Sequence, residues 1–327
     1  MGKYKIFVDG SSGTTGLRIA DRLAERDEFE ILKISEADRK DVRARAAVIN
    51  ESDLSFLCLP DDAAREVVPL LRDDVRILDT STAHRTAPGW VYGLPELHGT
   101  REALKTATRV AVPGCHATGF IAPVAPLVEL GIIPKAAHLN VTSLTGYSGG
   151  GKKMIGQYEG DKSDDLFAPR QYGLGQQHKH LKEIVSICHL AQEPVFTPIV
   201  DDYYSGMEVM IPFFSQLLTK KVTAKDVWEI LAKHYECCPF IHVLDFGADK
   251  GGFISANDMS GYDDMEIVVT GNDQRIMVTS LFDNLGKGAS GAAVQNMNLM
   301  LGFEMTAGLA LETPPAGSPA SARSERT

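Results

Sequence analysis

Short apolar runs alternate with helical patterns over the first third of the chain. The apolar runs occupy residues 4–9, 29–35, 54–60 and 75–81. Between them, apolar residues recur with helical spacing, first over residues 16–26. Strands that alternate with helices form right-handed βαβ units around a parallel sheet. The pattern therefore predicts an α/β domain of the Rossmann type over residues 1–114.

The pattern changes after residue 114. Apolar and polar residues alternate over longer runs at 137–146, 207–216, 265–271 and 275–283. Such alternation is typical of strands with one buried face. A helix predicted over residues 222–235 would cover one side of their sheet. We therefore expect a second, α+β domain with a mixed sheet over residues 115–285.

The C-terminal part of the chain divides into two segments. A helical pattern over residues 286–312 is expected to return to the first domain and complete it. Residues 313–327 are rich in Pro, Ser and Arg and have little apolar surface to bury. We expect this tail to be disordered.

Composition narrows the range of functions. The chain has 327 residues and a net charge of −10, which argues against a general nucleic-acid binder. No signal peptide opens the sequence, and no apolar run approaches the roughly 20 residues of a membrane helix. Five cysteines without zinc-type spacing indicate neither a disulfide framework nor a metal site. We expect a soluble, cytoplasmic protein that acts on a small molecule.

A glycine-rich loop, "GSSGTTG", joins the first strand to the first helix. Its G-x-x-G-x-x-G spacing departs from the usual dinucleotide motif, and an ordinary tight turn is the alternative interpretation. In a βαβ context, backbone N–H groups and the helix N-terminus face a pyrophosphate. We interpret the loop as a cofactor site formed by Gly10, Ser11, Ser12, Gly13, Thr14, Thr15 and Gly16.

The end of the second apolar run bears on the choice of cofactor. An acidic residue there binds the ribose of NAD, whereas hydroxyl groups and cations bind the 2′-phosphate of NADP. The chain offers Glu36 for the first role and Ser35, Arg39 and Lys40 for the second. Because three of these four residues suit a 2′-phosphate, we predict that the cofactor is NADP.

A second glycine-rich stretch, "LTGYSGGGKKM", spans residues 144–154. Gly146, Gly151 and Lys152 match the spacing of a nucleotide-triphosphate loop. Position 153 is Lys, so the hydroxyl that binds magnesium in such loops is missing. The stretch is therefore either a flexible turn or a site for a different phosphate.

Cys115 lies between an apolar run and a predicted helix. The positive end of a helix dipole lowers the pKa of a thiol, which predicts a nucleophile. Cys58 and Cys188 lie inside apolar runs instead and are expected to be inert core residues.

His178 and His180 stand where a helix is predicted to begin, and both are candidate acid/base residues. Two positions apart on a helix, they would point in nearly opposite directions. At most one would then act on the thiol unless the segment is extended. We favour His178, because Leu181 and Val185 place it on the apolar stripe of that helix.

Six motifs occur in order over residues 3–312: "DGSSGTTGLRI", "STAHR", "VPGCHATG", "GYSGGGK", "HKHLKEI" and "KGASGAAVQNMNLM". Together they resemble the short-form N-acetyl-gamma-glutamyl-phosphate reductases. The resemblance implies NADPH-dependent reduction of N-acetyl-L-glutamyl 5-phosphate to N-acetyl-L-glutamate 5-semialdehyde and phosphate. This step of arginine biosynthesis would pass through a thioester on Cys115. The resemblance also implies a homo-oligomer, a dimer or tetramer.

The phosphate at the second glycine stretch would then belong to the substrate. We predict that Lys152 and Arg85 hold it, since Arg85 follows a strand at the carboxyl edge of the sheet, where ligands bind. A surface arginine is the alternative interpretation. Further predicted positions are Pro60 and Asn296 for the cofactor, and Ser81, Gly149 and Gly150 for the substrate.

Two other functions remain open from the sequence. One is an aspartate-semialdehyde dehydrogenase or another acyl-phosphate relative, which shares the first glycine loop. The other is a non-catalytic dinucleotide-binding regulator in which Cys115 is structural. Substrate choice separates the first from the reductase, and replacement of Cys115 separates the second.

Overall fold

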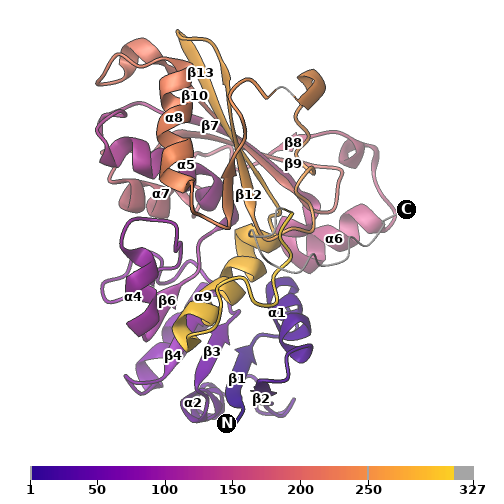
Figure 1. Cartoon of the computed structure of the whole chain (residues 1–327). Coiled ribbons are helices and arrows are strands. Elements are labelled where there is room, and N and C mark those ends of the chain that lie inside the picture. The colour runs from indigo at the N-terminus through magenta and orange to yellow at the C-terminus, as the bar shows by residue number, and fades with distance from the viewer. Residues whose placement is uncertain (1, 249, 313–327) are drawn as a thin grey trace.

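The computed structural model describes residues 2–248 and 250–312. The chain forms two sheets, each with its own helices, and the parallel sheet carries the N-terminus (Figure 1). The tail over residues 313–327, expected to be disordered, lies outside the described residues.

The first sheet is parallel throughout and has the strand order β2-β1-β3-β4-β6-β5. Its strands are β1 (Tyr4–Asp9), β2 (Phe29–Ile31), β3 (Leu54–Leu57), β4 (Arg76–Asp79), β5 (Val91–Tyr92) and β6 (Arg109–Ala111). The predicted parallel sheet is confirmed. The two-residue strand β5 was not predicted, because so short a segment carries no periodic signal.

Helices connect these strands on both sides of the sheet. They are α1 (Thr14–Ala24), α2 (Val42–Glu51), α3 (Asp61–Val67), the 3₁₀ turn Val68–Leu70, and α4 (Thr100–Thr106). Helix α1 buries Ile19 and Leu23 against the sheet. The Asp41 side chain accepts hydrogen bonds from two backbone N–H groups and so sets the start of α2.

The second sheet is mixed and has the strand order β11-β12-β13-β10-β7-β9-β8. Its strands are β7 (Asn140–Gly146), β8 (Arg170–Gln171), β9 (Val195–Asp201), β10 (Met207–Phe214), β11 (Ile241–Val243), β12 (Met265–Gly271) and β13 (Arg275–Phe282). Pairs β7·β9 and β11·β12 are parallel and the other four pairs are antiparallel. The predicted mixed sheet is confirmed.

One face of the second sheet is covered by α5 (Cys115–Glu129), α7 (Leu181–Cys188) and α8 (Ala224–Tyr235). A capping box formed by Thr223 and Asp226 starts α8. Helix α6 (Gly151–Glu159) lies apart, after the 3₁₀ turn Tyr147–Gly150 (Figure 1). Further 3₁₀ turns span Asp164–Phe167, Ser215–Leu217 and Lys250–Gly252.

The chain returns to the first sheet through a π-helical turn, Gly286–Ser290, followed by α9 (Gly291–Leu301). Buried residues of α9 pack in one core with Ile6 and Val8 of β1. The predicted continuous helix over 286–312 is wrong in its extent. Gly302 adopts a left-handed conformation with φ of 78°, which ends the helix at Leu301. No helix within the described ranges is both long and apolar enough to cross a bilayer.

Candidate active site

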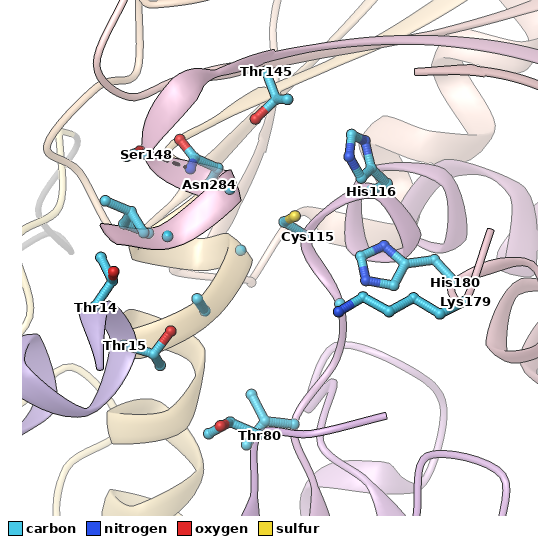
Figure 2. A pocket seen from close by; sticks show the side chains of 18 of the residues that line it. Thr14, Thr15, Thr80, Cys115, His116, Thr145, Ser148, Lys179, His180 and Asn284 are labelled. Carbon is cyan, nitrogen blue, oxygen red and sulfur yellow. Dashed lines mark hydrogen bonds between the residues drawn. The ribbon is translucent and has the colours of Figure 1, made fainter. Parts of the chain in front are cut away.

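A cavity of about 430 Å³ opens at the carboxyl ends of the parallel strands, between the two sheets. The first-domain wall comes from the glycine-rich loop, the ends of β3 and β4, and the segment after β6. The second-domain wall comes from the start of α5, the glycine turn before α6, the turn before α7, and the π-helical turn. Figure 2 shows the side chains that face its interior.

The glycine-rich loop has the close contacts of a dinucleotide cradle. A Cβ at Gly10 would overlap the Cys58 carbonyl, and one at Gly16 would overlap the Gly10 carbonyl, so both positions require glycine. Thr14 lines the cavity, and its buried Oγ1 has no hydrogen-bond partner among the described residues. An orphaned hydroxyl beside a helix N-terminus fits a bound pyrophosphate.

The predicted cofactor residues of this loop divide into two groups. Gly13, Thr14, Thr15 and Gly16 line the cavity. Gly10 supports the turn from behind, and Ser11 and Ser12 are exposed beside it.

The residues predicted to select NADP over NAD lie on the exposed segment after β2. The Ser35 hydroxyl donates to Asp38 over 2.7 Å, and Arg39 pairs with Glu36 at 2.9 Å. Lys40 is exposed on the same segment. None of the three predicted residues lines the cavity. The preference for NADP therefore stays a prediction.

Three other predicted positions, Pro60, Ser81 and Asn296, do not line the cavity. Pro60 is exposed at the start of α3, and Ser81 is buried, donating to Asp79 over 2.8 Å. Asn296 is fully buried, and its Nδ2 donates to the Gly93 carbonyl over 2.8 Å. At the strand ends, Leu59 and Thr80 line the wall in place of Pro60 and Ser81.

Cys115 is the first residue of α5, and its side chain faces the cavity (Figure 2). Glycine on two sides makes room for it. A Cβ at Gly288 would lie 2.8 Å from the Cys115 Cβ, and one at Gly114 would overlap both Arg85 and His180. Arg85 and His180 therefore lie against the residue that directly precedes the nucleophile, and the π-helical turn packs against its Cβ.

The predicted lowering of the Cys115 pKa is wrong in this structure. Burial raises the pKa of the thiol, although the His116 N–H and the charges of Arg85 and Lys179 act in the opposite direction. The helix N-terminus alone does not offset the loss of water around the sulfur. Burial raises the pKa of Cys58 further, to about 12, and also raises that of Cys188.

The two histidines lie in the turn before α7 and not on the helix, which begins at Leu181. Their ring centroids are 4.7 Å apart, and each lies 5.5 Å from the His116 ring. The expectation that His178 and His180 point in opposite directions is therefore wrong.

The prediction from the apolar stripe that His178 is the more buried of the two histidines is also wrong. His180 is 5% exposed, whereas His178 is half-buried. The backbone N–H of His180 donates to Nδ1 of His178 over 3.2 Å, so a neutral His178 carries its proton on Nε2. The His180 Nδ1 has no hydrogen-bond partner within the part of the chain that the structure describes.

Burial keeps both imidazoles neutral at pH 7. It lowers the pKa of His178 to about 4, with the charge of Lys179 acting in the same direction. It lowers the pKa of His180 well below 6.5, again with help from nearby cations.

Arg85 reaches the cavity wall, but its guanidinium is already bound. It donates to Glu183 over 2.6 Å, to the Val112 carbonyl over 2.9 Å, and to the Thr80 carbonyl over 3.2 Å. Both charged side chains are buried. Arg85 thus braces the wall around Cys115 with most of its donor capacity.

The glycine turn before α6 contributes Gly149 and Gly150 to the wall, as predicted positions of the substrate site. Lys152 follows them on α6, where it is exposed and does not line the cavity. The cation that does line it from the second domain is Lys179, between the two histidines (Figure 2).

A hydrogen-bonded chain beside the thiol was not predicted from the sequence. His116 contacts the Ser143 hydroxyl through Nδ1 at 2.7 Å and the Tyr172 hydroxyl through Nε2 at 2.6 Å. Tyr172 lines the cavity. Burial lowers the pKa of His116 to about 3 and raises that of Tyr172. The only sequence signal was the place of His116 next to Cys115.

Two family models match the chain. The NAD binding domain of semialdehyde dehydrogenases matches residues 5–107, and their dimerisation domain matches residues 115–284. The chain is therefore built from the nicotinamide-dinucleotide domain and the dimerisation domain of that group.

Solved structures agree on the fold. Aspartate semialdehyde dehydrogenase II from Vibrio cholerae superposes with a TM-score of 0.70 at 16% identity, over 92% of this chain and 99% of that one. The aspartate semialdehyde dehydrogenase from Francisella tularensis gives 0.68 at 13% identity, over 91% and 100%. At such identities the likeness concerns the fold alone.

Curated relatives are much more similar in sequence. N-acetyl-gamma-glutamyl-phosphate reductase 2 of Nostoc sp. (strain PCC 7120) is 44% identical over 324 residues, covering 94% of this chain and 100% of the relative. The N-acetyl-gamma-glutamyl-phosphate reductase of Brucella ovis is 43% identical over 308 residues, covering 92% and 99%. The resemblance drawn from the six motifs is confirmed, and the chain belongs to the N-acetyl-gamma-glutamyl-phosphate reductase family.

Proposed function

We propose that the protein reduces N-acetyl-L-glutamyl 5-phosphate to N-acetyl-L-glutamate 5-semialdehyde and phosphate, with NADPH as reductant, in arginine biosynthesis. One observation carries the proposal. The thiol of Cys115 lies at a helix N-terminus in a single cavity that also holds the dinucleotide loop and the glycine turn at 146–151. An acyl phosphate supplies the carbonyl carbon that such a thiol attacks.

The first step is acyl transfer to sulfur. The Cys115 sulfur attacks the acyl carbon, the bond from that carbon to the phosphoryl oxygen breaks, and phosphate leaves with the electron pair. The product is a thioester on Cys115. When bound, the reduced nicotinamide supplies the hydride that brings the thioester to the oxidation level of an aldehyde.

We assign the acid/base role to His180. Its ring lies against Gly114, directly before the nucleophile, and is neutral at pH 7. His180 takes the thiol proton as the sulfur attacks, and returns it to the sulfur after the aldehyde leaves. His178 holds its own proton on Nε2 and is better placed to donate a hydrogen bond to the substrate.

The dinucleotide would lie against the loop formed by Gly13, Thr14, Thr15 and Gly16, with the orphaned Thr14 hydroxyl toward its pyrophosphate. Ser35, Arg39 and Lys40 would meet the 2′-phosphate if their exposed segment folds onto it. This part of the proposal makes NADP the preferred cofactor over NAD.

We place the protein in the cytoplasm and infer a homo-oligomer, a dimer at the least. The exposed apolar residues of β10 support the oligomer. Strand β10 turns Val209 and Ile211 toward the helices, and presents half-buried Met210 and exposed Phe214 on the opposite face. A second copy of the chain would cover this apolar strip, as the dimerisation-domain match suggests.

Assay in the reverse direction tests the proposed reaction. NADP should be reduced only when the semialdehyde and phosphate are both present, because phosphate must attack the thioester to release the acyl group. Replacing Cys115 with Ala should abolish turnover while NADPH still binds. Rapid turnover without phosphate would contradict the proposal, as would higher catalytic efficiency on aspartyl phosphate.

A further inference from the structure

Two cations line the cavity in the described part of the chain, and they differ in what already binds them. Arg85 is buried and donates to Glu183 and to two backbone carbonyl oxygens. Lys179 is exposed and has no hydrogen bond or ion pair with any described residue. Of the two, Lys179 is the cation available to a ligand.

The turn before α7 places Lys179 beside the reacting thiol. Its neighbours His178 and His180 both direct their rings to the region of Cys115. In Figure 2 the Lys179 side chain extends beneath the His180 ring, with its ammonium end toward the segment that leads to Cys115. The position is fixed by the turn, while the ammonium group keeps the freedom of a flexible stem.

The Lys179 charge acts on ionisable groups of both domains. The Lys179 charge favours the thiolate of Cys115, although burial raises the pKa of that thiol. At Asp61, at the start of α3, burial opposes a lowering of the pKa by Thr82 and Arg65, to which Lys179 adds the smallest part. The Asp61 carboxylate is itself bound by the backbone N–H and hydroxyl of Thr82. The Lys179 charge thus acts on both groups, and no carboxylate of a described residue forms an ion pair with its ammonium group.

We propose that Lys179 binds the phosphoryl group of the acyl-phosphate substrate, and binds inorganic phosphate in the reverse reaction. This inference rests on the proposed function. As the carbon–oxygen bond breaks, negative charge grows on the departing phosphate, and a nearby ammonium group stabilises it. Lys152, exposed on α6 outside the wall, is then not required for this role.

The dinucleotide phosphates are the other anions that could meet this ammonium group. The two sources make different predictions, since inorganic phosphate enters the reverse reaction as a separate reactant. A cation for the substrate phosphate changes the KM for inorganic phosphate. A cation for the cofactor changes the dissociation constant of NADP.

The test compares K179M and K179R with the matched control K182M, which removes an exposed lysine of α7 three residues away. K179M should raise the KM for inorganic phosphate about 10- to 100-fold, as expected for loss of a charge-assisted contact. Its NADP dissociation constant should change by less than about 2-fold, which corresponds to a small free-energy difference. K179R should restore most of the phosphate affinity, and K182M should match the wild type.

An unchanged KM for phosphate in K179M would overturn the inference, and so would a loss confined to NADP binding. A separate readout is protection of Cys115 from iodoacetamide by inorganic phosphate. If wild-type turnover does not depend on phosphate, the proposed reaction is wrong, and this outcome is independent of the role of Lys179. Protection lost in K179M and kept in K182M would still support a phosphate site, and equal protection in both would refute it.

Discussion

Glu183 binds Arg85 through a carboxylate oxygen 2.6 Å from the guanidinium Nη1, with both side chains buried. The second carboxylate oxygen accepts from the Tyr92 hydroxyl over 2.7 Å and from the Gly114 N–H over 3.2 Å. The Glu183 carboxylate on α7 therefore binds both the Arg85 guanidinium at the cavity wall and the backbone N–H of Gly114, which directly precedes Cys115.

Replacing Glu183 with Gln should destabilise the protein by about 3 kcal/mol, because it leaves the Arg85 charge buried without a counter-ion. Turnover should fall as well, since the turn before Cys115 loses its anchor. Urea unfolding at pH 7 measures the first effect. E193Q, at an exposed glutamate, is the control and should change stability by less than about 0.5 kcal/mol. Equal midpoints for the two variants would disprove the role of the ion pair.

Replacing Gly288 with Ala should lower kcat at least about 10-fold and cost about 1–3 kcal/mol of stability. The added methyl group would lie 2.8 Å from the Cys115 Cβ and 3.2 Å from the Asp283 carbonyl, so the nucleophile must move. Gly156 on α6 has open space around it, which makes G156A the matched control. Full activity in G288A would mean that the π-helical turn yields without disturbing the thiol.

Replacing His180 with Asn should reduce kcat about 10²- to 10⁴-fold, the usual range for loss of a general acid/base. The same change at His178 should cost about 10-fold or less, because His178 is assigned to donate a hydrogen bond from Nε2 to the substrate and not to take the thiol proton. Steady-state kinetics of the two variants decide the assignment. A larger loss in H178N would return the role to the histidine that the apolar stripe favoured.

Iodoacetamide should label Cys115 before Cys58 and Cys188, at a rate that increases up to pH 9 and beyond. Burial raises the pKa of Cys115 above 9, and only the thiolate reacts, so alkylation accelerates as pH rises. Cys58, with a pKa of about 12, should remain unlabelled in the folded protein. Mass spectrometry of the labelled peptides measures both rates. A labelling rate that no longer increases above pH 7 would show that the charges of Arg85 and Lys179 lower the pKa of Cys115 more than burial raises it.

His116 should make the protein less stable in acid. The pKa of His116 falls from 6.5 to about 3 on folding. Between these pH values the unfolded chain binds a proton at His116 that the folded protein does not bind. This contribution is present at pH 7 and is lost as pH falls below 6.5. Between pH 7 and pH 5 it amounts to about 2 kcal/mol of unfolding free energy.

Denaturant titrations of the wild type and H116Q at both pH values measure that contribution. The variant should lose about 2 kcal/mol less stability than the wild type on acidification. Tyr172→Phe keeps the imidazole and serves as the control, with the pH dependence retained. Parallel pH curves for the wild type and H116Q would exclude His116 as the source.

Local patterns were enough to predict the two sheets and a helix beginning next to Cys115, which is the first residue of α5. Both signals are short-range: strand and helix periods differ, and a glycine directly precedes the nucleophile. The same reasoning failed at His178 and His180, because it assigned them to the helix α7, whereas they lie in the turn before it. The turn is held by the contact between the His180 N–H and the His178 ring, which the order of residues does not reveal.

The roles of the cations depend on partners that are distant in the chain. Arg85 meets Glu183 across 98 positions of sequence, and only that contact shows that its guanidinium is occupied. Lys152 follows three glycines and so looked like a phosphate ligand, yet α6 carries it to the surface. Lys179 lies between the two histidines of "HKHLKEI", but only the docking of α7 beside α5 shows that it lines the wall.

The return of α9 to the first sheet has a consequence for synthesis of the protein. Ala292, Val294 and Met297 complete a core whose other side is β1, yet they are made after the whole second domain. On the ribosome, α1 and α4 can cover part of this face of the N-terminal sheet, but the part that α9 buries stays uncovered until α9 emerges. Chains released early would expose that surface and be targets for chaperones and proteases.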